Sequence, residues 1–204
     1  MKREILILAK SAKRDNYCIA GVDINSNEFI RPISKRQDIE NAVPKDVVAN
    51  INVYDIVEID IESHVPTTAQ KENYYYNENI PWNKIGTSSN IQKYIQNPNK
   101  IFFDTYKSVD SSVLTGESLI LVNVTSPKIV VELSPYNGHK KIRLDFQYNN
   151  DNYKYISVSD PIIYNQYISR PIGEYPLTGP LCVLFSLTDK YIDDKYYKMA
   201  ASFL

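Results

Sequence analysis

Residues 128–168 decide the fold class, and they read KIVVELSPYNGHKKIRLDFQYNNDNYKYISVSDPIIYNQYI. The segments expected to be strands are 128–134, 140–148 and 153–159. Asn137-Gly138 lies between the first two, and Asn-Gly between alternating segments is the strongest short-range signal for a β-hairpin. Asp160-Pro161 offers an N-cap followed by proline at the first helical position. This stretch therefore predicts three strands followed by a helix.

The N-terminal part of the chain shows the same order of elements. The expected strands are 3–9, 17–24, 28–33, 54–65 and 118–124, with a short helix over 34–43 that Ser34 could cap and another over 89–96. Two more strands, 180–187 and 196–203, are expected after the helix of the second part, with a turn through Asp193-Asp194 between them. Three strands, a helix and two strands is the element order of the OB-fold, a five-stranded barrel.

The sequence thus predicts a mainly β protein of two tandem OB-like five-stranded barrels with short helices. We expect the first domain to span 1–126, with a long insertion at about 66–117, and the second to span 127–204. The alternative is one larger β-sandwich that groups the same strands differently.

Composition limits the functional classes. The chain has 204 residues and a net charge of −1, so no overall field attracts it to nucleic acid or to anionic membrane, and local patches must do so. Residues 1–10 lack the long apolar run of a signal peptide, and no segment has transmembrane length. Cys18 and Cys182 are then expected to be buried thiols, and the cytoplasm is the expected location.

Catalytic and metal-binding motifs are not found in the sequence. No nucleophile elbow, phosphate-binding glycine-rich loop or dinucleotide fingerprint occurs. His64 and His139 stand alone, and two cysteines cannot build a zinc site of the usual spacing. The sequence therefore indicates a binding protein rather than an enzyme, without cofactor or metal.

Tyrosine dominates the aromatic residues, with 17 tyrosines against six phenylalanines and one tryptophan. Tyrosine rings can stack on nucleobases, but strand propensity in an AT-biased genome accounts for most of them. Strand alternation predicts which rings face outward. In the first barrel we expect Cys18, Ala20, Val22, Ile24 and Ile30 to face the core. The expected ligand-binding residues on the reverse face and in the first loop are Tyr17, Phe29, Arg31, Lys10, Lys13 and Arg14.

A similar surface is expected on the second barrel. Ile142, Leu144 and Phe146 should face inward, together with Ile156 and Val158. The expected ligand-binding residues are Tyr136, Lys141, Arg143, Tyr153 and Tyr155. A solvated strand face with Tyr–Lys packing would have the same composition, so this alternative stays open.

Short blocks at both ends carry a resemblance to a known family. ILAKSAKRDNYCIAGVD (7–23), FIRPIS (29–34), CVLFSL (182–187) and YYKMAASF (196–203) resemble the dual OB-containing domain family of bacterial proteins. The resemblance implies two OB barrels, and by analogy of fold a nucleic-acid or nucleotide-type ligand.

Three functions are compatible with these observations. The first is a module that binds single-stranded RNA or DNA on the outward faces. The second is a binder of a small nucleotide-derived ligand, such as a signal sequestered in host–phage conflict. It would be held between the barrels or under the insertion, with residues 74–82 as a lid. The third is a protein-interaction subunit that binds either further copies of itself or another protein, with exposed tyrosines as interface anchors. No membrane partner is expected.

Overall fold

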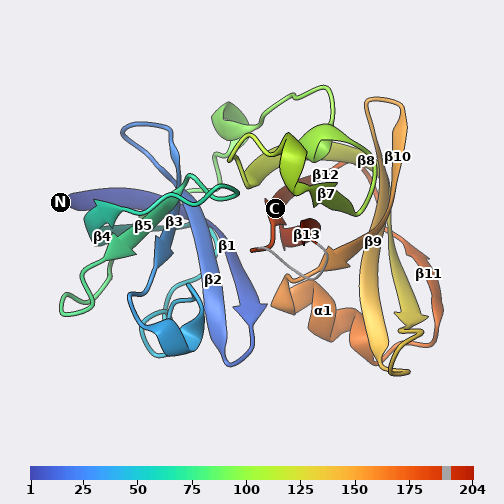
Figure 1. Ribbon diagram of the computed structural model, residues 1–204, viewed down its shortest axis with the longest axis horizontal. Coiled ribbons are helices and arrows are strands. Elements are labelled where there is room, and N and C mark those ends of the chain that lie inside the picture. The colour runs from blue at the N-terminus through green and yellow to red at the C-terminus, as the bar shows by residue number, and fades with distance from the viewer. Residues whose placement is uncertain (190–193) are drawn as a thin grey trace. The chain divides into compact units, whose positions relative to one another are not determined.

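The computed structural model describes residues 1–189 and 194–204, and these form two compact units, Met1–Tyr94 and Ile95–Leu204 (Figure 1). Each unit contains one closed five-stranded barrel. The predicted boundary at 126/127 falls inside one strand of the second unit, so the structure places the division earlier in the chain. No helix among the described residues is long and apolar enough to cross a membrane.

The strands of the first barrel are β1 (Lys2–Lys13), β2 (Asn16–Asp23), β3 (Phe29–Ile33), β4 (Asp55–His64) and β5 (Asn73–Tyr76). They are hydrogen-bonded in the order β1-β2-β3-β5-β4, and β4 also pairs with β1, so the five strands form a closed ring. The β3–β5 pair is parallel, whereas β1–β2, β2–β3, β4–β5 and β1–β4 are antiparallel. This connectivity is that of an OB-fold. A further strand, β6 (Asn83–Thr87), pairs with β4.

The fifth strand of the first barrel was expected at 118–124, and this expectation is wrong. The strand is β5, which lies inside the segment expected to be an irregular insertion. It has four residues and pairs parallel with β3, so neither strand alternation nor a hairpin turn marks it in the sequence. Residues 74–82 are not a lid: Tyr76 lies in the core, and Tyr74 and Trp82 pack against it.

The predicted orientation of β2 is wrong at Tyr17 and Ile19, whereas Ala20 and Val22 are buried as expected. Ile19 is fully buried in the core cluster with Ile5, Ile30 and Val57, and Tyr17 packs against this cluster. Tyr17 and Ile19 therefore face the barrel interior, and not Cys18. Residues 18–22 read CIAGV and are small or apolar throughout, so they offer no alternation from which the inward face could be read. The inward orientation of Ile30 is confirmed.

The barrel strands of the second unit are β8 (Leu119–Leu133), β9 (Lys140–Tyr148), β10 (Asp151–Val158), β12 (Leu181–Leu187) and β13 (Lys195–Phe203). Their order is β10-β9-β8-β12-β13, and parallel pairing of β10 with β13 closes the barrel. Two short strands lie outside the barrel: β11 (Gly173–Pro176) pairs with β8, and β7 (Ser108–Asp110) pairs with β13. The prediction of two tandem OB-like barrels is thereby confirmed.

One long strand, β8, replaces the two strands expected at 118–124 and 128–134. It continues through a bulge between Thr125 and Lys128, where Ser126 has a φ of 50°. Pro127 cannot donate to the ladder, and the bulge accommodates it. The stretch around Pro127 is therefore a bulge within one strand. It is not the boundary between two domains that the sequence predicted at 126/127.

The helix of the second unit, α1 (Pro161–Ile168), begins where the sequence predicted it. The Asp160 carboxylate accepts hydrogen bonds from the amides of Ile162 and Ile163 at 2.8 and 3.1 Å, as an N-cap does. Its second oxygen accepts from the Phe203 amide at 3.1 Å, so the same side chain fixes the helix to β13.

The other two predicted helices are single 3-10 turns. They are η1 (Gln37–Ile39) and η2 (Gln92–Tyr94), and the further turns η3 (Ile101–Phe103) and η4 (Ser111–Val113) lie in the second unit. Ser34 does not cap η1: its hydroxyl binds Glu78 and the Arg36 amide. Of the turn predicted through Asp193-Asp194, Asp193 lies outside the described residues.

Gly21 allows β1 and β2 to approach closely. A Cβ at this position would overlap the Leu6 carbonyl oxygen and lie 2.7 Å from Ile5 Cγ2. At Gly86, in β6, a Cβ would meet only Ile56 Cδ1, at 3.9 Å. We therefore expect Gly21→Ala to lower the free energy of unfolding by about 1–3 kcal/mol, measured by urea unfolding. Gly86→Ala is the matched control and should change it by less than about 0.5 kcal/mol. Equal effects of the two variants would contradict this account of the strand contact.

Candidate functional site

Lys10, predicted to bind a ligand, instead holds the loop before β4. Its ammonium donates to the carbonyl oxygens of Val48 and Ile51 at 2.6 and 2.8 Å, and it lies 4.9 Å from the centre of the Tyr17 ring. Burial lowers the pKa of Lys10 from its ordinary value. Both Lys10 and Tyr17 therefore have structural contacts.

The other predicted residues of the first barrel do not gather on one surface. Lys13 donates to the Glu40 carbonyl oxygen, and Arg14 forms a 2.9 Å ion pair with the carboxylate of the same residue. Arg31 is only 6% exposed and forms a 3.2 Å ion pair with Glu72. Phe29, paired with Val22 of β2, is half-buried. Lys13, Arg14 and Arg31 therefore each have a partner within the first unit.

A bulge separates the two predicted tyrosines of β10, Tyr153 and Tyr155. A bulge in β10 lies between Tyr153 and Ile156, and both of these residues are fully buried. Tyr155, at the bulge, has a φ of 60° and is 49% exposed. Its amide donates to the Asp145 carboxylate at 2.7 Å. The prediction that Tyr153 faces outward is therefore wrong, because the bulge reverses the alternation between residues 153 and 156.

The remaining predicted residues of this barrel lie on its surface in separate places. Arg143 forms a 2.9 Å ion pair with Glu132 and a hydrogen bond with Ser157 across the strands. Lys141 is half-buried, and Tyr136 is 96% exposed at the tip of the β8–β9 hairpin. Ile142, Leu144 and Phe146 are buried, as the alternation of β9 predicted.

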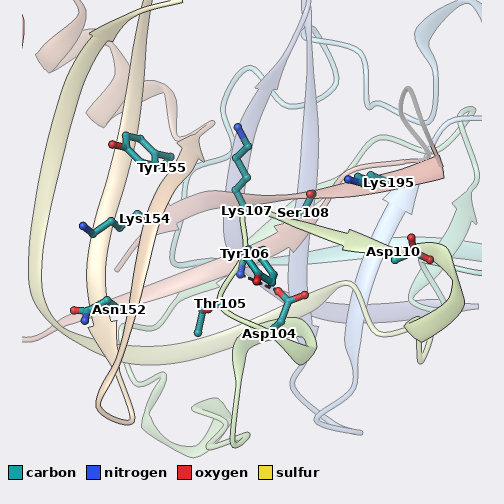
Figure 2. Close-up of a pocket in the computed structure, with 10 residues that line it drawn as sticks. All are labelled: Asp104, Thr105, Tyr106, Lys107, Ser108, Asp110, Asn152, Lys154, Tyr155 and Lys195. Carbon is teal, nitrogen blue, oxygen red and sulfur yellow. Dashed lines mark hydrogen bonds between the residues drawn. The ribbon is translucent and has the colours of Figure 1, made fainter.

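A groove of about 620 Å³ lies in the second unit, between β10 and the segment 104–110 (Figure 2). Its lining residues are Asp104, Thr105, Tyr106, Lys107, Ser108, Asp110, Asn152, Lys154, Tyr155 and Lys195. Tyr106 is 74% exposed and Tyr155 is 49% exposed. The groove therefore combines two accessible aromatic rings with the ammonium groups of Lys107, Lys154 and Lys195.

The two carboxylates of the groove already have hydrogen-bond partners. Asp104 binds Lys198 and accepts from the Tyr106 amide at 3.0 Å. Asp110 accepts from the amide and the hydroxyl of Ser112 at 2.9 and 2.8 Å, and these bonds hold its pKa below the ordinary value. Among the described residues, neither Lys107 nor Lys154 forms an ion pair. The groove therefore carries positive charge that is not neutralised by neighbouring carboxylates of the described residues, and this charge attracts anions.

A second depression, of about 260 Å³, continues the groove across the outer face of the barrel. It shares Asn152 and Lys154 with the groove and reaches Gln147 on β9 and Lys128 on β8. In the order of an OB-fold, β8, β9 and β10 are the first three strands, and the face of the second and third is the one on which OB-folds bind oligonucleotides and oligosaccharides. The groove thus lies beside the face that this fold class uses for ligands.

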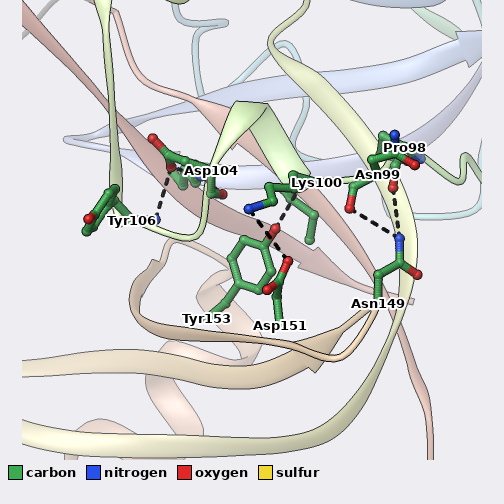
Figure 3. Close-up of polar contacts among 10 residues, drawn as sticks. Pro98, Asn99, Lys100, Asp104, Tyr106, Asn149, Asp151 and Tyr153 are labelled. Atoms are coloured by element: carbon green, nitrogen blue, oxygen red, sulfur yellow. Dashed lines mark hydrogen bonds and ion pairs between the residues drawn. The ribbon is translucent and has the colours of Figure 1, made fainter.

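The segment 98–107, which we call the strap, contributes residues 104–107 to one wall of the groove. It is hydrogen-bonded to β9, β10 and β13. Figure 3 shows its contacts with Asn149, Asp151 and Tyr153. The Tyr148 hydroxyl donates to the Pro98 carbonyl oxygen at 2.6 Å, and the side-chain amide of Asn149 donates to the same oxygen at 3.1 Å. The Tyr153 hydroxyl accepts from the Ile101 amide at 3.0 Å. The buried Tyr153 is therefore an anchor for the strap.

Lys198 holds the other end of the strap. Its side chain is 1% exposed, and its ammonium donates to the carbonyl oxygen and the carboxylate of Asp104 at 2.6 and 2.8 Å. It also lies 5.6 Å from the centre of the Tyr153 ring. Burial lowers the pKa of Lys198, and the bond to Asp104 opposes this effect. One ion pair, between a buried ammonium and a partly exposed carboxylate, thus fixes the groove wall to β13.

Most of the groove could not be found by strand alternation. Tyr106 and Lys107 lie in the segment expected to be an irregular insertion, where no periodicity assigns a face. The adjacent aromatic and basic residues at 106 and 107 are the sequence signal that could have identified them. Among the described residues, no three His, Cys, Asp or Glu side chains form a cluster that could hold a metal ion.

Two closed five-stranded barrels, each with the strand order of an OB-fold and one with a ligand-sized groove, define a tandem OB-fold protein. The family model described as "dual OB-containing domain" matches residues 3–203, and the chain belongs to this family. No curated protein matches the chain.

The Asp104–Lys198 pair can be tested by removing either partner. Asp104→Asn keeps the acceptor oxygen but leaves the ammonium buried without a countercharge, so we expect it to lower the free energy of unfolding by about 1–3 kcal/mol. Lys198→Met removes the charge and keeps the volume, and it should cost less than about 1 kcal/mol. Urea unfolding of the two single variants and the double variant measures both.

The pH dependence has a definite sign. The pKa of Lys198 in the folded chain is below the unfolded value, so a rising pH removes the proton from the folded state first and adds stability in this window. The difference in the free energy of unfolding between the parent and Asp104→Asn should therefore shrink as the pH rises toward 10.5, the ordinary pKa of lysine. A deficit that is constant with pH would contradict an uncompensated ammonium as its cause.

Proposed function

We propose that the second barrel binds single-stranded nucleic acid in the groove between β10 and residues 104–110. The observation that carries the proposal is the arrangement of Lys107, Lys154 and Lys195 around the exposed rings of Tyr106 and Tyr155. Sites for single strands combine cations along the backbone with aromatic platforms for the bases.

Single strands fit the groove better than a duplex for a physical reason. The faces of the bases are accessible in a single strand, and each stacking contact with an aromatic side chain contributes about 1–3 kcal/mol by alanine substitution. The depression across β8, β9 and β10 extends the path along the face that OB-folds use, which supports binding of several nucleotides in a row. The net charge of −1 means that affinity depends on this local cluster.

The salt dependence of binding tests the proposal. Three phosphate contacts should give a slope of log K against log salt of about −2, because each contact contributes about −0.7 for a single strand. Changing Lys107, Lys154 and Lys195 together to Gln should bring the slope close to zero and weaken binding. Fluorescence anisotropy with a labelled oligonucleotide at several salt concentrations measures both quantities.

The matched control is Lys13, Arg14 and Lys45 changed together to Gln, which removes the same charge from the first barrel. This variant also tests the loop that the sequence favoured as a nucleic-acid surface. It should keep the slope of the parent. If this control flattens the slope and the groove variant does not, the groove is not the site.

A small nucleotide-type ligand is the second candidate for the same groove. Its volume of about 620 Å³ lies within the range of about 300–1,000 Å³ that is usual for small-molecule sites. In this case the parent protein should bind a mononucleotide more tightly than it binds an oligonucleotide per site. The double variant Tyr106→Ala and Tyr155→Ala should lose the affinity for the mononucleotide. Isothermal titration with both ligands distinguishes the two functions.

A further inference from the structure

Two successive phenylalanines in the strap adopt left-handed backbone conformations. Phe102 has a φ of 50° and Phe103 has a φ of 73°. A residue with a bulky side chain is strained in this conformation, which lowers the stability of the fold. Phe102 is 4% exposed, so its packing in the core offsets this cost. Phe103 is 47% exposed, and its own burial offers no comparable gain.

The ring of Phe103 lines a cavity. The cavity has about 400 Å³, and around Phe103 its lining includes Asn99, Lys100, Leu114, Glu117, Ile120 and Leu187. Ile120 and Leu187 are buried, and with Leu114 they give it apolar walls. It shares no lining residue with the groove, which uses positions 104–110 of the same part of the chain. The cavity is therefore a separate site.

Polar groups at the cavity are few and chemically distinct. Glu117 is exposed and offers two acceptor oxygens, and among the described residues no cation pairs with it. Asn99 offers an amide that can donate and accept. Lys100 offers a cation, whose one ion pair among the described residues is to Asp151 at 3.9 Å (Figure 3).

We propose that this cavity binds a guanine base, stacked on Phe103 and held by Glu117. A carboxylate can accept two parallel hydrogen bonds from adjacent donors. Guanine presents such a pair, N1–H and the N2 amino group, on its Watson–Crick edge, whereas adenine and cytosine place an acceptor beside their amino group. Lys100 is available for the phosphate of the same nucleotide. The guanine belongs either to a free mononucleotide or to the end of a strand.

An aromatic side chain of a peptide fits the cavity less well. A phenylalanine ring has no donor for Glu117, and an indole has one N–H, so the second carboxylate oxygen would lose water without gaining a bond. A peptide-like probe therefore distinguishes the two kinds of ligand, and it is included in the test below.

Ligand discrimination is the first test, by isothermal titration of the full chain. GMP should bind, and IMP should bind about tenfold or more weakly because it lacks the N2 amino group. AMP should bind more weakly still, because adenine has neither this amino group nor the N1–H donor. Tryptophan amide is the peptide probe. Equal affinities for GMP, IMP and AMP, or binding of tryptophan amide alone, would overturn the proposal.

Phe103→Asn is the sharpest variant, because asparagine tolerates the left-handed conformation and has no ring. If the ring is retained for a ligand, this variant should keep or raise the melting temperature and weaken GMP binding about tenfold or more. A lower melting temperature would show that the ring stabilises the fold, and would overturn the proposal. Glu117→Gln should abolish the preference for GMP over IMP without changing the melting temperature.

Two further measurements separate the sources of the base and the two sites. An oligonucleotide with a 3′-terminal guanosine, compared with one ending in adenosine, tests the strand end, and GMP tests the free nucleotide; a guanine preference in neither would overturn the proposal. The variant Lys107, Lys154 and Lys195 to Gln should leave GMP affinity unchanged. A large loss of GMP affinity in that variant would place GMP in the groove and overturn the assignment to the cavity.

Discussion

Closure of each barrel depends on one short parallel pair of strands. In the first barrel Arg31, Pro32 and Ile33 pair with residues 73–75, and in the second Ser157 and Val158 pair with Met199 and Ala200. These few contacts join the two edges of each sheet, so no barrel strand is left with an unpaired edge at that point. The antiparallel hairpins could form in a flat sheet as well. The parallel pairs are what give the strands a common interior, and with it the burial of the core.

The position of the groove depends on the bulge in β10, which lies next to the parallel pair that closes the second barrel. Near its pairing with β13, β10 carries the bulge at Tyr155, and the Asp145 carboxylate satisfies the amide that the bulge leaves without a strand partner. The bulge allows Tyr153 to enter the core and anchor the strap, and it turns Tyr155 to the surface. One irregularity therefore serves both the interior and the wall of the groove.

The sequence was sufficient for every element with a strong local signal. Asp160-Pro161 predicted the start of α1, and the alternation of residues 140–148 predicted both the bounds and the inward face of β9. It was insufficient where the structure depends on distant contacts: β5 is set by parallel pairing, and the face of β2 is hidden by small and apolar residues throughout. Of the predicted site residues, Tyr155 lines the groove; Tyr106 and Lys107 lie where no periodicity exists.

The two barrels differ in how much of the chain each one requires. All five strands of the first lie within residues 2–76, so a nascent chain can close it while the rest is still being synthesised. The second cannot close until residues 195–203 have left the ribosome, because β13 pairs with both β10 and β12. Until then β10 and β12 each lack the β13 partner, so two strand edges stay unpaired and the last stage of synthesis is the period most exposed to aggregation and to chaperone capture.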